Sequence, residues 1–84
     1  MGIPARKLKV RAFGITREIL GGRDLVLEID GQTVADLRNE LLTRYTELTG
    51  LKSLMIAINN SYAEDSQIIH DSDEIALIPP VSGG

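Results

Sequence analysis

The chain has 84 residues, of which 43% are hydrophobic, with nine basic and twelve acidic side chains. This length suits one small domain, and the hydrophobic residues are spread along the chain without the continuous apolar run that a membrane-spanning helix needs. The net charge of −3 argues against a nucleic-acid partner, and the absence of cysteine excludes disulfides, thiolate nucleophiles and thiolate metal sites.

The N-terminal stretch "MGIPARKLKV" has no apolar segment of the kind found in secretion signals, so we expect a cytoplasmic protein without a membrane partner. In "KLKVRAF" (Lys7–Phe13), apolar and basic residues alternate with the period of two that is typical of a half-buried strand. The basic side chains between Arg6 and Arg11 are interpreted as one solvated face of this strand.

A short helix and a second strand are predicted next. In "ITREILGG", Ile15, Ile19 and Leu20 have helical spacing, and Gly21–Gly22 can adopt the left-handed conformation that ends a helix. In "DLVLEID", apolar residues alternate again, and the strand leads into Asp30–Gly31, a strong turn signal.

The clearest helix begins after Thr33, a good N-cap residue with Asp36 three positions later. We expect this helix to run to about Leu48 and to end before Gly50. Its apolar face consists of Val34, Leu37, Leu41 and Tyr45. Its other face is interpreted as solvated charge and consists of Arg38, Glu40, Arg44 and Glu47.

Two more strands complete the pattern. "SLMIAINN" alternates from Leu54 to Asn59 and is followed by a turn, residues 62–72 are predicted to be mainly loop, and the last strand spans Glu74–Ile78. Pro79 ends that strand because proline has no N–H to donate. One long amphipathic helix on one face of a mixed sheet is an α+β sandwich, and this order of elements suits the ubiquitin-like β-grasp.

No site for chemistry is evident in the body of the chain. His70 is the single histidine, and with Asp71 and Asp73 nearby it could be drawn as a metal or acid–base site. Charged turn residues are usually solvated, however, and the acids lack the spacing of a calcium loop. We therefore predict no metal site and do not expect an enzyme that works alone.

The C-terminal stretch "IPPVSGG" is the remaining candidate. Pro79–Pro80 favours an extended path away from the sheet, and glycine can enter a channel too narrow for other residues. A terminal carboxylate is a poor acyl donor until a partner activates it. These features alone leave two interpretations open, a reactive tail and a frayed chain end.

Three stretches together resemble a known family. The ending "DEIALIPPVSGG", the segment "LKVRAFGITREILGG" and the stretch that starts at "LMIAINNSYAEDSQIIH" are similar to the small subunits of molybdopterin synthase, ubiquitin-like sulfur carriers of the MoaD/ThiS superfamily. Ser72 departs from that family, which usually has glycine before the Asp-Glu pair, but serine is a tolerable turn residue. Residues 1–6 have no counterpart and are predicted to be a disordered extension, followed by the domain over residues 7–80 and a flexible tail over residues 81–84.

The resemblance implies that Gly84 carries the sulfur. An E1-like adenylyltransferase would use ATP and Mg²⁺ to convert its carboxylate to an acyl adenylate, and a sulfur donor protein would convert this to a thiocarboxylate. The tail, consisting of Val81, Ser82, Gly83 and Gly84, would enter the active site of the large subunit and give sulfur to a pterin precursor, forming the dithiolene that holds molybdenum. The resemblance also implies a heterotetramer whose catalytic side chains lie in the large subunit, so this chain would bind no permanent cofactor.

An apolar patch next to the tail is the predicted partner interface. It combines outward sheet residues with the proline stem and consists of Phe13, Met55, Ala57, Ala76, Ile78, Pro79 and Pro80. The alternative that Phe13 and Ile78 complete the core stays open.

Three other functions also stay open. The chain could be the sulfur carrier of thiamin thiazole synthesis, although that family usually lacks the Pro-Pro stem. It could be a ubiquitin-like modifier joined through Gly84 to a lysine by an isopeptide bond, or a plain binding module with an inert tail.

Overall fold

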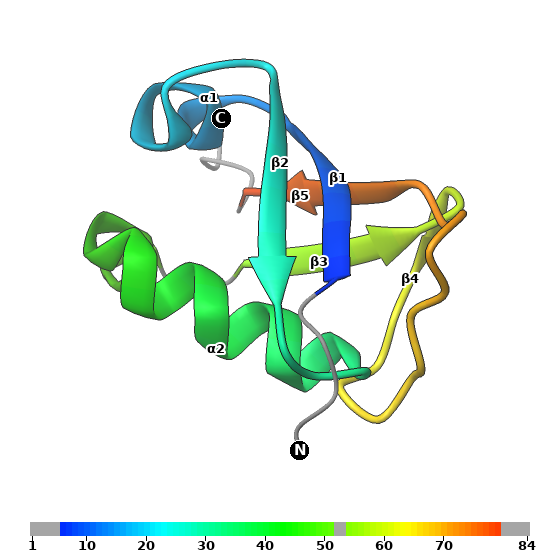
Figure 1. Cartoon of the computed structure of the whole chain (residues 1–84). Helices are drawn as coiled ribbons and strands as arrows, with labels where there is room; N and C mark the ends of the chain where they lie inside the picture. The colour runs from blue at the N-terminus through cyan, green and yellow to red at the C-terminus, as the bar shows by residue number, and fades with distance from the viewer. Residues whose placement is uncertain (1–5, 52–53, 80–84) are drawn as a thin grey trace.

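The computed structural model describes residues 6–51 and 54–79. They form a five-stranded sheet in the order β2-β1-β5-β3-β4, with helix α2 packed on one face (Figure 1). β1 and β5 are parallel at the centre, and the other neighbouring pairs are antiparallel. The strands are β1 (Arg6–Ala12), β2 (Asp24–Ile29), β3 (Met55–Ile58), β4 (Ser61–Tyr62) and β5 (Ile75–Ile78). The helices are α1 (Ile15–Leu20), α2 (Val34–Arg44) and the 3-10 helix η1 (Thr46–Gly50).

The predicted alternation of the long strands is confirmed. Side chains that alternate along β1, β2, β3 and β5 point to the α2 side of the sheet and are buried there. The core that they build with the helices includes Leu8, Val10, Leu27, Ile29, Leu37, Leu41, Ile56, Ile75 and Leu77. The opposite face of the sheet, which we call the outer face, has no helix over it among the described residues (Figure 1).

Helix α1 ends as predicted, because Gly21 has a left-handed conformation with φ 84° and the N–H groups of Gly21 and Gly22 both donate to the carbonyl of Arg17. The predicted buried face of this helix was partly wrong. Leu20 is buried as expected, but Ile15 is exposed and Thr16 is buried in its place. Thr16 is accepted in the interior because its hydroxyl is hydrogen-bonded to the backbone of Phe13.

Helix α2 begins with the predicted capping box. The Thr33 hydroxyl accepts from the backbone N–H of Asp36, and the Asp36 carboxylate accepts from the backbone N–H of Thr33. Hydrogen bonds from the backbone N–H groups of Thr33 and Gln32 lower the pKa of Asp36.

The predicted end of this helix was wrong, because α2 stops at Arg44 and not near Leu48. Tyr45 leaves the helical conformation with φ −121° and ψ 78°, and η1 follows. The 3-10 turn still buries Leu48, so the apolar spacing that predicted a longer helix reflects burial correctly. Spacing alone did not distinguish the two helix types.

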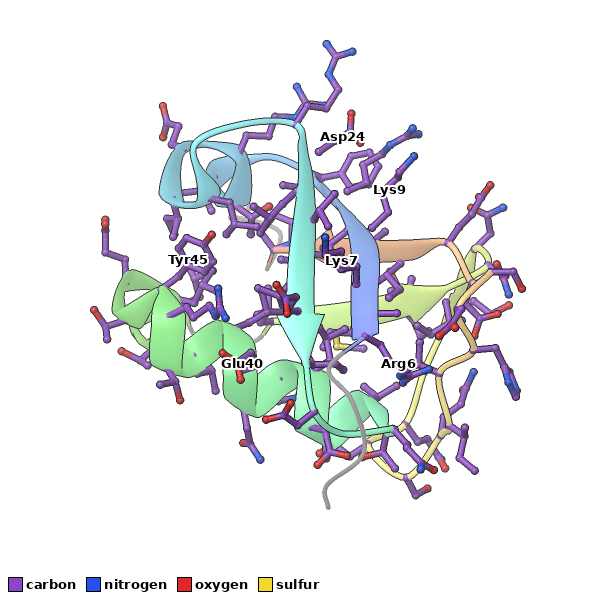
Figure 2. All side chains as sticks on the ribbon, in the orientation of Figure 1. Arg6, Lys7, Lys9, Asp24, Glu40 and Tyr45 are labelled. Atoms are coloured by element: carbon purple, nitrogen blue, oxygen red, sulfur yellow. The ribbon has the colours of Figure 1, made fainter. Side chains whose placement is uncertain are left out.

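Arg6 was predicted to belong to a disordered extension and to a solvated strand face, but it lies in β1 opposite Ile29. Its side chain is 21% exposed and points to the α2 side of the sheet. The guanidinium donates to the carbonyls of Ile69 (2.8 Å) and Gly31 (3.2 Å) and to the Asp71 carboxylate (2.9 Å). Arg6 thus connects the start of β1 (Figure 2) to two distant segments, the turn after β2 and the loop before β5. Lys7, Lys9 and Arg11 are exposed, as predicted.

Arg38 was also predicted to be solvated, but it connects α2 with two other segments. It donates to the carbonyl of Leu54 at 2.6 Å and forms an ion pair with Asp65 at 3.2 Å. Because both partners are distant in the sequence, helical spacing could not identify this role.

The second half of the chain follows the predicted order. Asn59 and Asn60 have positive φ and turn the chain between β3 and β4, and the loop after β4 forms a single bridge between Ile68 and Thr33. The result is the predicted ubiquitin-like β-grasp. Over the residues that the structure describes, no helix combines the length and the apolar character needed to cross a membrane.

Candidate functional site

The root of the C-terminal segment is held by the centre of the sheet. β5 lies between β1 and β3, and its last residue, Ile78, is paired with Met55. Pro79 follows directly and ends the ladder as predicted. A strand that is paired on both sides cannot swing, so the chain leaves the sheet at a fixed place beside α1 (Figure 1).

Gly14 shapes the surface against which Pro79 lies. Its backbone has φ 57° and ψ −135°, a conformation that residues with a Cβ rarely adopt. A Cβ at this position would also lie 3.0 Å from the Cγ of Pro79. The glycine is therefore required twice, once for the turn from β1 into α1 and once for the close approach of the segment that leads to the tail.

Phe13 is held beside this turn by its neighbours. The Thr16 hydroxyl accepts from the Phe13 N–H at 2.9 Å, and the guanidinium of Arg17 lies 5.9 Å from the centre of the Phe13 ring. Arg17 also donates to the Ala12 carbonyl at 3.2 Å. Phe13 and Ile78 are both half-buried and neither belongs to the buried core cluster, so the prediction that they contact a partner stays a prediction.

Four of the predicted interface residues form one block on the outer face. Met55 lies opposite Ile78, and Ala57 lies opposite Ala76, on the adjacent strands β3 and β5. Met55 is 39% exposed, whereas Ala57 is only 7% exposed and offers little surface of its own. The pairing explains why these residues, which are far apart in the sequence, form a continuous apolar surface.

Tyr62 extends this block and was missed by the sequence analysis. It lies opposite Ala57 across the β3–β4 hairpin and is 67% exposed. Counting the hairpin register outward from the Asn59–Asn60 turn would have placed it on the outer face. Exposed tyrosine side chains are enriched at partner surfaces.

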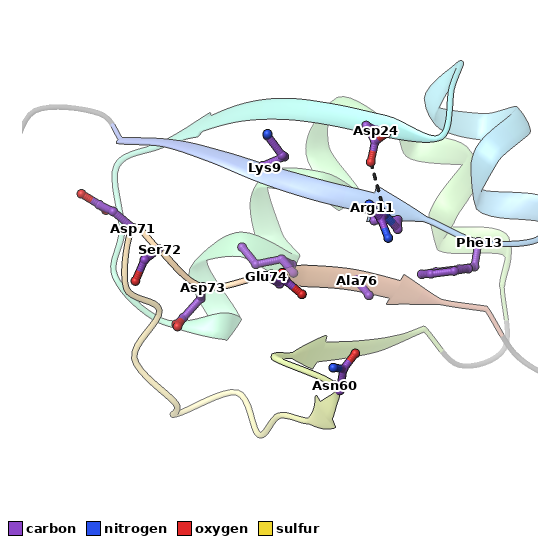
Figure 3. Close-up of a pocket in the computed structure, with 11 residues that line it drawn as sticks. Lys9, Arg11, Phe13, Asp24, Asn60, Asp71, Ser72, Asp73, Glu74 and Ala76 are labelled. Atoms are coloured by element: carbon purple, nitrogen blue, oxygen red, sulfur yellow. Dashed lines mark hydrogen bonds and ion pairs between the residues drawn. The ribbon is translucent and has the colours of Figure 1, made fainter.

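A groove of about 440 Å³ runs along the outer face from Phe13 toward the turn before β5 (Figure 3). Lys9 and Arg11 on β1 line one side, and acidic residues between Asp71 and Glu74 line the other. Ala76 lies between them, opposite Arg11 in the parallel pair β1–β5. The groove therefore joins the apolar block to a strip of both charges, and it ends at Phe13, next to the root of the tail.

His70 and the nearby acids form a structural turn. The backbone N–H of His70 donates to the Asp73 carboxylate at 2.8 Å. The side-chain amide of Asn59 donates to the other oxygen of the same carboxylate at 3.0 Å. These two hydrogen bonds lower the pKa of Asp73. Within residues 6–51 and 54–79, no group of three or more His, Cys, Asp or Glu side chains is placed to hold a metal ion.

The predicted tail residues Val81, Ser82, Gly83 and Gly84, and Pro80 of the stem, lie outside the described residues. The described part of the site therefore consists of the root of the tail, where Pro79 lies against Gly14, and the outer face beside it.

Comparison with known proteins places this arrangement in context. Residues 10–84 match the model of the ThiS family. A molybdopterin synthase sulfur carrier subunit from Arabidopsis thaliana is 38% identical over 80 residues, which cover 93% of this chain and 83% of the relative.

Two solved structures are also similar. The solution structure of the small archaeal modifier protein 1 from Methanosarcina acetivorans has a TM-score of 0.77 at 29% identity and covers 95% of this chain and 98% of its own. A chain of the complex of subunits 1 and 2 of molybdopterin-converting factor from Helicobacter pylori has a TM-score of 0.65 at 26% identity. This match covers 93% of our chain and 99% of the Helicobacter pylori chain.

Proposed function

Since the chain belongs to the ThiS family and is similar to molybdopterin synthase sulfur carrier subunits, we propose that it is a sulfur carrier subunit of molybdopterin synthase. The observation that carries this proposal is the fixed root of the tail, where Pro79 lies against Gly14 near the apolar block on the outer face. Such a root fixes the point on the surface at which the following residues begin.

The chemistry takes place on Gly84. Its carboxylate oxygen attacks the α-phosphorus of ATP in an E1-like adenylyltransferase, pyrophosphate leaves, and the mixed anhydride with AMP makes the carbonyl carbon electrophilic. Hydrosulfide delivered by a donor protein then attacks this carbon, AMP leaves, and loss of the S–H proton gives the thiocarboxylate. ATP and Mg²⁺ belong to the activating partner, so this chain needs no cofactor of its own.

Sulfur transfer takes place in the large subunit. The tail Val81–Gly84 enters its active site, with Gly83 as the narrow part. The thiocarboxylate sulfur displaces an oxygen substituent from a carbon of the pterin precursor, and water then hydrolyses the thioester, which leaves the sulfur on the pterin and restores the Gly84 carboxylate. The catalytic side chains belong to the partner. Similarity to a chain of the two-subunit complex from Helicobacter pylori supports a large-subunit partner.

The outer-face block next to the tail root is the proposed contact for these partners. Met55, Ile78 and Tyr62 supply its apolar area, and Phe13 with Pro79 extends it toward the root of the tail. An apolar centre beside a charged groove matches the composition of partner interfaces, which have apolar centres and polar rims.

Intact mass spectrometry tests the carrier chemistry. After incubation with the activating enzyme, ATP and a sulfur donor, the protein should gain the mass that replaces one oxygen with one sulfur. Deletion of Gly84 should abolish this gain and the conversion of the pterin precursor without changing the thermal unfolding midpoint, since residue 84 follows the packed strands. Conversion by the deletion variant would refute the proposal.

A charge on the outer face tests the docking surface. We expect Met55→Asp to weaken binding to the large subunit by about tenfold or more, because it places a charge in an apolar contact. Thr46→Asp, at an exposed position in η1, is the matched control and should bind normally. Equal binding by both variants would place the interface elsewhere.

A second function is favoured by the similarity to the small archaeal modifier protein 1. In this alternative, the activated Gly84 carbonyl is attacked by a lysine amine, forms an isopeptide bond and releases AMP. Conjugates of higher mass that disappear on deletion of Gly84 would support it, and the same mass spectrometry distinguishes them from the thiocarboxylate.

A further inference from the structure

The strand β2 forms one edge of the sheet. Within the described residues it is paired only with β1, along all six of its positions. In Figure 1 it is the strand at the end of the sheet, next to β1. An edge of this length presents a row of backbone N–H and C=O groups to which another strand can pair.

The ladder with β1 shows which residues offer those groups. The Ala12 N–H donates to the Arg23 carbonyl at 2.8 Å, so Ala12 and Arg23 form a hydrogen-bonded pair. In an antiparallel ladder such pairs alternate with pairs whose backbone groups point away from each other. The backbone N–H and C=O groups that point away from β1, toward the free edge, are therefore those of Asp24, Val26 and Glu28.

The side chains of the same three residues lie on the outer face. Val26 is 59% exposed, and it stands between the two carboxylates of Asp24 and Glu28. Each acid already lies opposite a base on β1, Asp24 opposite Arg11 and Glu28 opposite Lys7. A base on a further strand would continue these rows, because opposite charges on neighbouring strands attract each other.

The surface beyond the end of β2 is also acidic. A groove of about 230 Å³ lies between the end of β2 and α2, and its lining includes Asp30, Asp36 and Glu40. Arg44 is paired with Glu40 at 2.6 Å and reduces the charge there, but the acidic side chains outnumber it. The free edge and the groove next to it therefore carry the same sign of charge.

We propose that β2 is a docking edge for an extended, basic segment of a partner protein, which adds to the sheet as a sixth strand. Backbone hydrogen bonds to Asp24, Val26 and Glu28 hold the segment, and basic side chains next to the two carboxylates set its register. An apolar side chain between the two bases packs on Val26.

A second copy of this chain does not suit the edge. Antiparallel pairing of two β2 strands about Val26 would place Asp24 of each copy opposite Glu28 of the other. Like charges that face each other across strands are destabilising. The two acids thus discourage self-association and still admit a basic strand from a different protein.

The docking edge is independent of the proposed sulfur chemistry. β2 lies two strands away from β5, which leads to the tail, so one partner can hold the edge while another receives the tail. Its test can therefore fail or succeed regardless of whether Gly84 carries sulfur.

The experiment titrates the full-length protein with a short peptide, acetyl-Lys-Thr-Val-Thr-Lys-amide, and follows backbone amide signals by NMR. We expect the largest shifts at residues 24–28 and slower hydrogen exchange at the amides of Asp24, Val26 and Glu28. The matched peptide with glutamate in place of both lysines should cause no shifts there. Equal shifts with both peptides, or shifts confined to the acidic loop at residues 64–74, would overturn the proposal.

Two variants test the two kinds of contact. Val26→Pro removes one outward N–H without removing a bond to β1, and should weaken binding by about threefold to tenfold relative to Val26→Thr, which keeps the N–H. Glu28→Gln leaves the backbone unchanged and should weaken binding by about twofold to threefold. If Val26→Pro does not fold, Glu28→Gln still tests the proposal, because an unchanged affinity for the peptide in that variant would overturn the proposed register. Sedimentation without peptide should show a monomer, and a dimer whose β2 amides are protected would mean that a second copy occupies the edge.

Discussion

Replacing Gly14 with alanine tests whether the turn after β1 fixes the root of the tail. The backbone of Gly14, with φ 57° and ψ −135°, is strained for any residue with a Cβ, at a cost of about 1–3 kcal/mol. The new methyl group would also lie 3.0 Å from the Cγ of Pro79, so the proline must move or the turn must open. We expect the free energy of unfolding to fall by about 2–3 kcal/mol in total.

Thermal and urea unfolding measure this loss. For a domain of this size, 1 kcal/mol corresponds to about 4–8 °C, so Gly14→Ala should lower the unfolding midpoint by about 10–20 °C. Two other glycines supply matched controls. Gly21 has a positive φ but no close neighbour, so Gly21→Ala should lower the free energy of unfolding by about 1–2 kcal/mol. Gly50 has neither feature, so Gly50→Ala should change the free energy of unfolding by less than about 0.5 kcal/mol.

A double-mutant cycle separates the backbone strain from the contact with Pro79. In the Pro79→Ala background the methyl group gains room, so Gly14→Ala should cost less there than in the original protein. An equal cost in both backgrounds would refute the argument that Gly14 positions Pro79. A Gly14→Ala variant as stable as Gly50→Ala would refute the strain argument itself.

Three further predictions concern the segments that hold the sheet and α2 together. Gly31→Ala should destabilise the protein by about 1–2 kcal/mol in urea unfolding, because its Cβ would overlap with the Asp36 side chain and break the capping box. Backbone hydrogen bonds lower the pKa of Asp36. The contribution of its carboxylate to stability is therefore complete above about pH 4 and is lost as the pH falls through the lowered pKa. Asp36→Asn should flatten the acid side of a stability profile measured between about pH 2 and 6. Arg6→Met should cost about 1–3 kcal/mol, and increased amide exchange at Ile69 and Gly31 would locate the loss, whereas unchanged exchange at both would contradict the clamp.

Patterns within one segment predicted most of the fold. Alternating residues identified the long strands, and Thr33 with Asp36 identified the start of α2, since strand alternation and capping depend on neighbours in the sequence. The end of α2 could not be found in this way, because Leu48 is buried by a 3-10 turn with nearly helical spacing. The backbone contacts of Arg6 and Arg38 connect distant segments and leave no local signal.

The candidate site was predictable to a similar extent. The outward positions of Met55 and Ala76 followed from strand alternation, but their union with Tyr62 in one surface required the strand order and the hairpin register. The role of Gly14 at the tail root also depends on a contact with Pro79 near the other end of the chain. The chemistry predicted for Gly84 rests on the resemblance to a family and stays a proposal.

The parallel pairing of β1 with β5 links the readiness of the carrier to the completion of folding. Val10 and Ile75 are neighbours in the sheet but lie almost the whole chain apart, so this contact carries a high entropic cost and is expected to form late. Until it forms, β5 can be paired only with β3, and the outer face lacks the side formed by β1 and β2. Under the proposed function, a chain without this contact would lack the complete outer face that we expect the activating enzyme to contact, so incompletely folded molecules would not consume ATP.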